Sequence, residues 1–567
     1  MFNNKQTQLF APVTKASTKK ATSSKSIKKT DVPAFVEAGL KKQAVSLSGN
    51  GALKFSTTGN EFVNQFGKLG TYKAPRSYEQ IAKDCEILWG DNPLVSVKFM
   101  HYLRTIPRQV VLFNGDKTED AQKGGELKHE PIFRMIWLSQ KSPETFWKNI
   151  GLFVSLGSWH DIFTMLQYDL VYNTWNGRKL DWQKFGNLIL TALENKNTCE
   201  LVKKYLPQIK ARSACKTVES QANTIIAKWI CSLLFGEKET SWNYKKYRQL
   251  KTSGTAHEWQ KLISTKKFDR IEFDKIHGRA LNLLVRSKFL KNQGLSDKYS
   301  AWVTKPETKV KYTGFVHELF SNLPNSLSDV PLHEQSTINK QFHTLVEKGK
   351  TDGVTSLICV RDTSGSTGAL CTGTNTTVYN VEKALALYFS EFLHGKFANS
   401  WIEFNSDAQM HTWKGDSPLS KWYNDHSSFV GSTNFESVIH LFAKIKKQGI
   451  PESEFPTGIL CLSDGEFNPA SLGKTNVESA LNILRRAGFS DEYVDNFVIV
   501  LWNLQSSYYG KGTGEKFETF GINTPNVFYF SGFSASTVSF LTNQKVFTVQ
   551  ELFDAAMDQQ ILNMVTL

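Results

Sequence analysis

Residues 362–366 read Asp-Thr-Ser-Gly-Ser and follow the apolar run 355–360, with Arg361 between them. Two later positions extend this pattern: Thr433 stands in a Gly-Ser-Thr-Asn stretch, and Asp464 follows a second apolar run, Ile-Leu-Cys-Leu-Ser. Each of these polar side chains therefore stands where a predicted strand ends or a loop begins. Because ligands of open α/β sheets bind beyond the carboxyl ends of the strands, the pattern predicts such a sheet with a site at that edge.

The candidate site consists of oxygen donors suited to a hard divalent cation. Asp362, Ser364, Ser366, Thr433 and Asp464 supply three hydroxyls and two carboxylates. A cation such as Mg²⁺ prefers a near-octahedral set of oxygen ligands and retains some water. If the carboxylates act mainly through water, the cation keeps much of its charge and takes an anionic oxygen from outside. The alternative is that these residues cap helices and bind nothing.

Composition favours a soluble protein of two or three domains in a reducing compartment. The chain has 567 residues, of which 40% are hydrophobic, and it contains no run of about 18 apolar residues that would span a membrane. Residues 1–30 lack the apolar segment of a signal peptide. Seven cysteines without a Cys-x-x-Cys pair predict free thiols rather than disulfides or zinc. We expect a cytoplasmic monomer.

The formal net charge of +15 is unevenly distributed. Residues 351–567 contain 14 Lys and Arg against 22 Asp and Glu, so the excess positive charge lies in residues 1–350. Seven lysines fall within residues 1–30, which have too few large apolar side chains to fold and are predicted to be a disordered basic tail. A basic half joined to an acidic half indicates contact with a polyanion, although lysines also simply solvate helix faces.

Capping signals predict helices from about residue 77 onward. Ser77 with Gln80 has capping-box spacing, Asn92-Pro93 and Ser142-Pro143 each read as a helix start, and Gly157 ends a helix. Further helical patterns cover 183–205, 219–235, 255–265 and 274–291. Longer connections are expected at 107–125 and 236–252, and a hinge is expected at 326–350.

After residue 350, short apolar runs alternate with amphipathic helices. The expected strands are 355–361, 400–405, 408–413, 457–463, 496–502 and 526–530, and the expected helices are 377–394, 434–448, 475–487 and 548–563. The alternation predicts a doubly wound parallel sheet. The fold class is therefore α plus α/β. The predicted domains are a tail at 1–30, a helical domain of stacked helix pairs at 31–345, and a sheet domain at 350–567.

The sheet domain resembles von Willebrand factor A domains. That family carries a metal-ion-dependent adhesion site (MIDAS) with the pattern Asp-x-Ser-x-Ser, then a distant Thr and a distant Asp, and this chain has all five in order at residues 362, 364, 366, 433 and 464. The resemblance implies Mg²⁺, or another divalent cation, held directly by the three hydroxyls. It also implies a protein partner that supplies a carboxylate.

The helical half resembles the TROVE module of the Ro ribonucleoprotein autoantigen, and more closely a family of the same two-part layout. The matching stretches include Asn-Pro-Leu-Val-Ser-Val-Lys-Phe at 92–99, residues 148–163, Ile-Ile-Ala-Lys-Trp-Ile at 225–230, and residues 259–280. The resemblance implies a ring of HEAT-like helices that binds small or misfolded RNA. The chain has no clear copy of the family's RNA-contact residues.

Two basic clusters with nearby aromatic residues are the candidates for RNA contact. The residues are Lys203, Lys204, Lys210, Arg212 and Lys216 in the first cluster, and Lys245, Lys246 and Arg248 in the second, which is expected in a loop. Lysine and arginine neutralise phosphates, and aromatic rings stack on unpaired bases. The alternative for each cluster is a solvated helix face.

Catalytic motifs are missing from the sequence. It contains no phosphate loop, no His-Glu-x-x-His and no Gly-x-Ser-x-Gly, so we expect a binding protein rather than an enzyme. The leading hypothesis is an RNA-binding protein with a Mg²⁺-dependent protein-binding site. The alternative is a scaffold protein, such as a virion component, that acts through the MIDAS without RNA.

Overall fold

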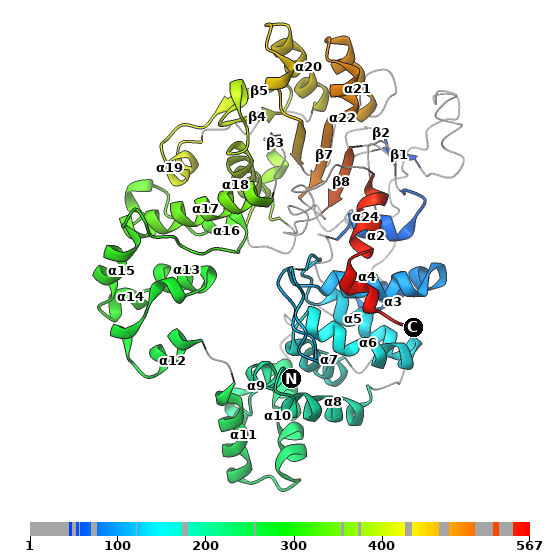
Figure 1. The fold of residues 1–567 in the computed structure, drawn as a ribbon, viewed down its shortest axis with the longest axis vertical. Helices are drawn as coiled ribbons and strands as arrows, with labels where there is room; N and C mark the ends of the chain where they lie inside the picture. The colour runs from blue at the N-terminus through cyan, green and yellow to red at the C-terminus, as the bar shows by residue number, and fades with distance from the viewer. Residues whose placement is uncertain are drawn as a thin grey trace, which may run out of the picture. The chain divides into compact units, whose positions relative to one another are not determined.

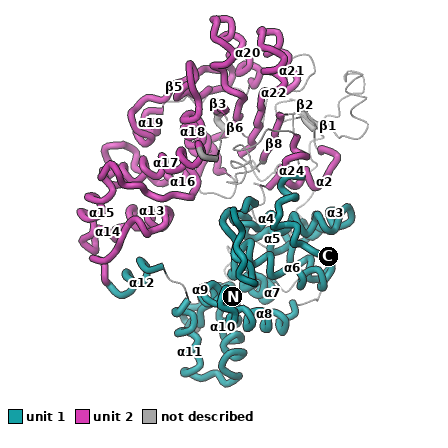
Figure 2. The backbone as a smooth tube through the Cα atoms, viewed as in Figure 1, with its two compact units in different colours: residues 1–12, 75–266, 554–567 teal, residues 13–74, 267–553 magenta. Residues whose placement is uncertain are grey.

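The computed structural model of the chain describes residues 45–47, 53–55, 57–69, 76–120, 122–172, 180–254, 257–352, 356–371, 376–425, 434–463, 476–504, 526–531 and 548–567. The predicted basic tail at 1–30 lies outside these residues. Two compact units are distinguished in Figure 2. The described parts of unit 1 fall between 75 and 266 and between 554 and 567, and those of unit 2 fall between 13 and 74 and between 267 and 553. The two units divide the chain at residue 266, whereas the sequence predicts a domain boundary near residue 345, where helices are followed by alternating strands and helices. That domain boundary stays a prediction.

Unit 1 is helical. Its described helices are α3 (Tyr78–Asp91), α4 (Pro93–Arg104), α5 (Glu130–Lys141), α6 (Pro143–Leu156), α7 (Trp159–Val171), α8 (Trp182–Glu194), α9 (Cys199–Tyr205), α10 (Val218–Phe235), α11 (Ser241–Ser253) and α12 (Glu258–Ser264), with short 3₁₀ turns at Arg212–Ala214 and Gln560–Met564. The predicted starts are confirmed. Ser77 and Gln80 form the capping box of α3, and Asn92 caps α4 ahead of Pro93.

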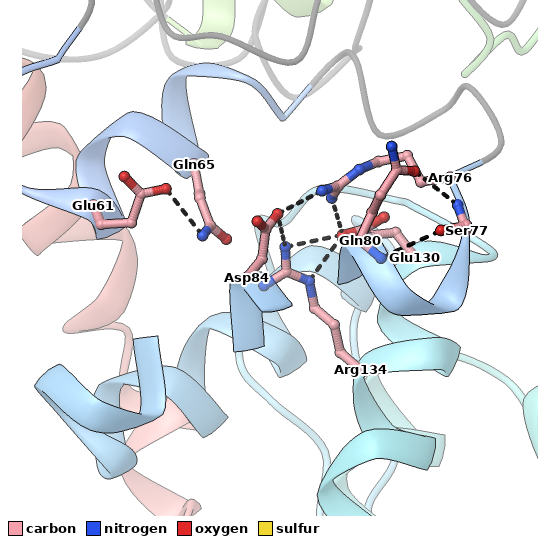
Figure 3. A network of polar contacts seen from close by, with 8 residues as sticks. All are labelled: Glu61, Gln65, Arg76, Ser77, Gln80, Asp84, Glu130 and Arg134. Carbon is pink, nitrogen blue, oxygen red and sulfur yellow. Dashed lines mark hydrogen bonds and ion pairs between the residues drawn. The ribbon is translucent and has the colours of Figure 1, made fainter. Parts of the chain in front are cut away.

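A buried ionic network joins α3 to the start of α5 (Figure 3). The fully buried Arg134 donates to Glu130 Oε1 through its Nη2 atom at 2.9 Å, and Arg76 Nη1 donates to the same oxygen at 2.8 Å. Arg76 Nη2 also donates to Asp84 Oδ2 at 2.6 Å. Glu130 therefore compensates two guanidinium groups, of which one has no access to water.

Residues 558–567 pack into unit 1 although they follow unit 2 in the sequence. The side-chain amide of Asn149 donates to the Thr566 carbonyl at 2.5 Å and accepts from the Thr566 N–H at 3.0 Å. Lys98 Nζ donates to Asn563 Oδ1 at 2.6 Å, and Val565 lies in the hydrophobic core of the unit. This paired recognition satisfies both backbone polar groups of Thr566.

Several expectations about the helices are wrong. The pattern at 183–205 is divided into α8 and α9, because Asn195 and Thr198 direct their side chains to backbone groups, which competes with helical hydrogen bonding. The stretch 236–252 contains α11, whose first turn is capped by the Thr240 hydroxyl. The expected hinge at 326–350 is mostly α17 (Leu332–Asp352), because Ile338, Phe342 and Val346 form an apolar stripe at helical spacing that is buried.

Unit 2 contains the sheet and the helices that surround it. Its described helices are α2 (Glu61–Gly67), α13 (Gly278–Arg286), α14 (Phe289–Asn292), α15 (Ser296–Val303), α16 (Val316–Leu319), α17, α18 (Val378–Ser390), α19 (Pro418–Tyr423), α20 (Phe435–Lys446), α21 (Asn476–Arg486) and α22 (Asp491–Asn496). A short antiparallel pair, β1 (Val45–Leu47) and β2 (Leu53–Phe55), also belongs to it. Helix α24 (Val549–Met557) crosses the division between the units.

All six predicted strands form one sheet, visible among the helices of unit 2 in Figure 1. The strands are β3 (Leu357–Asp362), β4 (Ser400–Phe404), β5 (Ala408–Thr412), β6 (Gly458–Ser463), β7 (Val498–Asn503) and β8 (Val527–Ser531). Their order is β5-β4-β3-β6-β7-β8, with every pair parallel except β4 and β5. The predicted parallel sheet is thus confirmed in its strands and is mixed at one edge.

Helices bury both faces of the sheet. Alternate strand residues such as Ile358, Val360, Ile459 and Cys461 pack with α20 and α21 in one core. The intervening residues, including Cys359, are equally buried and lie on the face that α18 contacts. Burial on both sides explains why β3 and β6 read as nearly continuous apolar runs. All seven cysteines of the chain are free thiols.

Within the described residues, no helix has both the length and the apolar character needed to cross a membrane.

We predict that Glu130→Gln lowers the free energy of unfolding of unit 1 by about 3 kcal/mol, because Arg134 then carries a buried charge without its main compensating carboxylate. Urea unfolding of the full chain measures this loss. The exposed Glu79 on α3 provides the control, since Glu79→Gln should change stability by no more than about 0.5 kcal/mol. Equal effects of the two substitutions would contradict the role of the network.

Candidate functional site

The carboxyl ends of β3 and β6 meet at the centre of the sheet. The two strands are parallel neighbours, with Arg361 opposite Leu462. The chain proceeds from β3 to β4 on one side and later returns to β6 on the other. This is the topological switch point of an open α/β sheet, where ligands bind beyond the strand ends.

Asp362 ends β3 at this point and is fully buried. Its Oδ1 atom accepts a hydrogen bond from the Ser364 N–H at 2.9 Å, and its Oδ2 atom accepts one from the Ser463 hydroxyl at 2.7 Å. Ser463 is the last residue of β6. The carboxylate is therefore held in a fixed orientation by groups from both strand ends, and its charge is partly compensated.

The predicted metal ligands are described to different extents. Asp362 and the largely buried Ser364 lie together after β3. Ser366 belongs to a 3₁₀ turn, Gly365–Gly368, in which only its backbone is described. Thr433 and Asp464 lie outside the described residues, so the completed five-residue site stays a prediction.

The donors that are described fit a hard cation in kind. Asp362 supplies an oriented carboxylate and Ser364 a hydroxyl at the edge of the sheet where the sequence predicts the site. In the described part of the chain, no three His, Cys, Asp or Glu side chains gather as a metal-binding group. The predicted ligand set does not require one, because three of its five members are hydroxyls.

A second buried carboxylate lies beside this edge. Glu403 on β4 accepts from the Thr363 hydroxyl at 3.0 Å through Oε1, and its Oε2 lies 2.8 Å from His411 Nε2. Thr363 directly follows Asp362, so this pairing also fixes the loop after β3. Sequence analysis did not identify Glu403 or Ser463, although both stand at or near the ends of predicted strands.

A cluster of buried charged side chains lies next to Asp362, the first residue of the predicted metal site. Arg361, on β3 next to Asp362, contacts Asp425 Oδ2 through Nη1 at 3.0 Å, and Lys383 Nζ lies 3.5 Å from the same oxygen. The Tyr379 hydroxyl donates to that oxygen at 3.1 Å. One carboxylate thus serves two cations and a phenol, with Arg361 fully buried.

Aromatic rings surround these cations. The Arg361 guanidinium lies 4.2 Å from the centroid of the Trp401 ring, and Lys383 Nζ lies 4.5 Å from that of Trp422. Cation–π contact partly replaces the lost hydration. Burial nevertheless lowers the pKa of Lys383 to about 8, with Asp425 opposing the shift and Arg361 adding to it. Burial would also lower the pKa of Arg361, but Asp425 and Tyr379 raise it above its ordinary value.

The predicted basic clusters lie on α9, on the segment that follows it, and on α11. Lys203 and Lys204 are in the last turn of α9, Lys210 and Lys216 are exposed in the following segment, and Arg212 is described only by its backbone. Lys203 is engaged with Glu200 at 2.9 Å. Lys245, Lys246 and Arg248 are exposed on α11.

Helix α11 packs directly against the end of α9. Lys251 Nζ donates to the Leu206 carbonyl at 2.5 Å and to the Lys204 carbonyl at 3.3 Å, and the buried Tyr247 hydroxyl donates to the Pro207 carbonyl at 3.0 Å. Trp242, which sequence analysis did not select, is 58% exposed on α11. The Nζ atoms of Lys245 and Lys246 lie 5.6 and 5.4 Å from its ring centroid.

Residues 356–564 match a protein family described as "Domain of unknown function (DUF7788)". The match begins at β3 and includes the whole six-stranded sheet, which amounts to rather more than a third of the chain. No curated protein matches the chain. No solved structure matches it.

We predict that Asp425→Asn lowers the free energy of unfolding of unit 2 by about 3 kcal/mol or more, because it leaves Arg361 and Lys383 buried without their shared carboxylate. Lys383→Met should cost much less, since Arg361 keeps its partner and Met fills a similar volume in the aromatic surroundings. Urea unfolding followed by tryptophan fluorescence compares the two variants. A larger loss for Lys383→Met would contradict the assigned roles.

Proposed function

We propose that unit 1 binds RNA through the surface of α9 and α11, and that unit 2 binds Mg²⁺ at the carboxyl edge of its sheet and thereby holds a protein partner. The observation that carries the RNA proposal is the packing of α11 against α9. It brings residues of the two predicted basic clusters onto adjacent helices beside an exposed tryptophan.

The chemistry of this surface suits a single-stranded polyanion. Exposed Lys204, Lys245, Lys246 and Arg248 can neutralise phosphates, which supplies most of the affinity in sequence-independent binding. The exposed Trp242 offers a face on which an unpaired base stacks, and such stacking is worth about 1–3 kcal/mol per base. Lys203 is ion-paired with Glu200, whereas within the described part of the chain no carboxylate pairs with Lys245, Lys246 or Arg248.

The proposal for unit 2 is supported by the position and fixation of Asp362 at the switch point. Together with Ser364, Ser366, Thr433 and Asp464, it would hold Mg²⁺ in the manner of the von Willebrand factor A domains that the sequence resembles. The cation would act as a Lewis acid toward a carboxylate of the partner. The protein residues would fill the other coordination positions of the cation and leave one position for the carboxylate of the partner.

The two halves together support a protein of the Ro type. A helical region resembling the TROVE module precedes a mostly parallel sheet of six strands in the part of the sequence that resembles a von Willebrand factor A domain. We propose HEAT-like stacking for the helical region. We propose a binding role without catalysis, in a reducing compartment such as the cytoplasm, in keeping with seven free thiols.

Sequencing of nucleic acid that co-purifies with the chain tests this role: discrete small RNAs support it, and a nucleic-acid-free preparation favours a scaffold.

We predict that the triple variant Lys245→Gln/Lys246→Gln/Arg248→Gln weakens binding to single-stranded RNA at every sequence tested. Loss of three phosphate contacts should reduce the slope of log K against log salt by about 2. Fluorescence anisotropy at several salt concentrations measures both quantities. The matched control is Lys83→Gln/Lys117→Gln/Lys141→Gln, which removes the same charge from exposed positions elsewhere on unit 1 and should leave the slope unchanged. Equal effects would show that only net charge matters.

We predict that Mg²⁺ raises the thermal stability of the chain and that Asp362→Ala abolishes this rise while RNA affinity stays within twofold. At a concentration of about 100 times its Kd, a ligand of the folded state stabilises by about 2.7 kcal/mol. Differential scanning calorimetry with and without Mg²⁺ measures the effect. The exposed Asp416 gives the control, because Asp416→Ala should retain the Mg²⁺ response. An undiminished response in Asp362→Ala would refute the proposed site.

A further inference from the structure

A group of basic and titratable side chains lies beside the end of α9 in unit 1. His129 precedes α5, and His160 is in the first turn of α7; both are partly exposed. Lys128 and Arg108 are exposed in the same unit. The sequence analysis assigned none of these four residues a function.

Both histidines are held in place by uncharged hydrogen-bond partners, which do not compensate the positive charge of a protonated imidazole. His129 Nδ1 is hydrogen-bonded to the Tyr168 hydroxyl, and its ring stacks on the Tyr168 ring. His160 Nδ1 lies 3.0 Å from the Thr164 hydroxyl. A phenol and an alcohol orient the rings but carry no negative charge at neutral pH.

Asp161 is a carboxylate that acts on this group, and it is already engaged. Asp161 accepts from Arg104 Nε at 2.7 Å and from Arg104 Nη2 at 3.0 Å, and its Oδ2 atom also accepts from the Ser158 N–H at 2.9 Å. Arg104 and Asp161 are both buried. Asp161 therefore neutralises Arg104 and caps α7, which leaves Lys128, Arg108 and the two histidines with a net positive field.

The neighbouring cations affect the pKa of both histidines. Partial burial, Lys128, His160 and Arg104 lower the pKa of His129. Partial burial also lowers the pKa of His160; Asp161 opposes that shift, whereas Arg104 and Lys128 add to it. Partial burial lowers the pKa of Arg108, which Tyr205 and Asp161 oppose. Cations placed so that they disfavour one another's charge are stabilised when an anion binds among them.

The group is continuous with the basic surface of α9. The His160 ring meets the Tyr205 ring edge to face at 6.2 Å, and Lys204 Nζ lies 5.3 Å from the centroid of that same Tyr205 ring. Arg108 Nη2 donates to the Gly157 carbonyl at 2.7 Å, next to the start of α7. A polyanion bound along α9 and α11 therefore reaches this group without leaving the basic surface.

We propose that Arg108, Lys128, His129 and His160 form a phosphate-binding site that extends the RNA-binding surface and takes up protons as the phosphate binds. This inference rests on the proposed RNA function for its ligand, a phosphate of the RNA chain. Phosphate fits because its oxygens accept from guanidinium, ammonium and imidazolium groups together. Binding makes both imidazoles easier to protonate, so affinity rises as pH falls.

The test measures RNA affinity of the full chain at pH 8, 7 and 6 at constant ionic strength. We expect binding to single-stranded RNA to tighten about tenfold or more from pH 8 to pH 6, because uptake of one proton contributes up to about tenfold per pH unit. His129→Gln/His160→Gln should abolish this pH dependence, so that its affinity falls further below that of the unaltered chain as the pH is lowered. His394→Gln/His440→Gln replaces two exposed histidines of unit 2 and should leave the pH dependence unchanged. Thermal unfolding checks that each variant is folded.

A second measurement uses inorganic pyrophosphate in the absence of RNA. Pyrophosphate should slow the modification of His129 and His160 by diethyl pyrocarbonate, mapped by mass spectrometry, but not that of His394. Protection without RNA binding would refute the proposed function and retain a site for free phosphates. RNA binding that is independent of pH, or equally pH-dependent in the double variant, would overturn the phosphate site and retain the proposed function.

Discussion

Parallel pairing of β3 with β6 is the constraint on which the candidate metal site depends. It sets two strand ends side by side, so that Ser463 of one strand reaches the carboxylate of Asp362 on the other. The pairing in turn requires both faces of the sheet to be apolar and covered by helices, which α18, α20 and α21 provide. A site at the switch point is thus a property of chain topology, and its residues come from segments a hundred positions apart.

Buried charges recur in both units, and they share one arrangement. In unit 1, Glu130 compensates Arg76 and Arg134; in unit 2, Asp425 compensates Arg361 and Lys383. In each case a single carboxylate serves two cations. Such clusters contribute little net stability compared with apolar packing, but removal of the shared carboxylate weakens the compensation of two cations at once. The anion is therefore the sensitive position, and either cation is more easily replaced.

The sequence predicted the sheet well because its signals are local. Apolar runs such as those ending at Asp362 and Asp464 leave little alternative to buried parallel strands, and Ser77 or Asn92 mark helix starts within one turn. A hinge was expected at 326–350 because polar residues outnumber apolar ones in this stretch, and that expectation was wrong. The signal for a helix was the helical spacing of Ile338, Phe342 and Val346. Contacts between distant residues, such as Ser463 with Asp362 or Asp425 with Arg361, have no local signature. The histidines of unit 1 were missed for the same reason, since their shared field arises from three separate segments.

The packing of residues 558–567 on Asn149 has a consequence for biosynthesis. Unit 1 receives these residues only after the whole of unit 2 has been translated, because they follow it in the chain. While residues 267–553 are being translated, the surface around Asn149 and Lys98 stays uncovered. Unit 1 is therefore completed only after residues 267–553 have been translated, and a premature stop within those residues also leaves unit 1 incomplete.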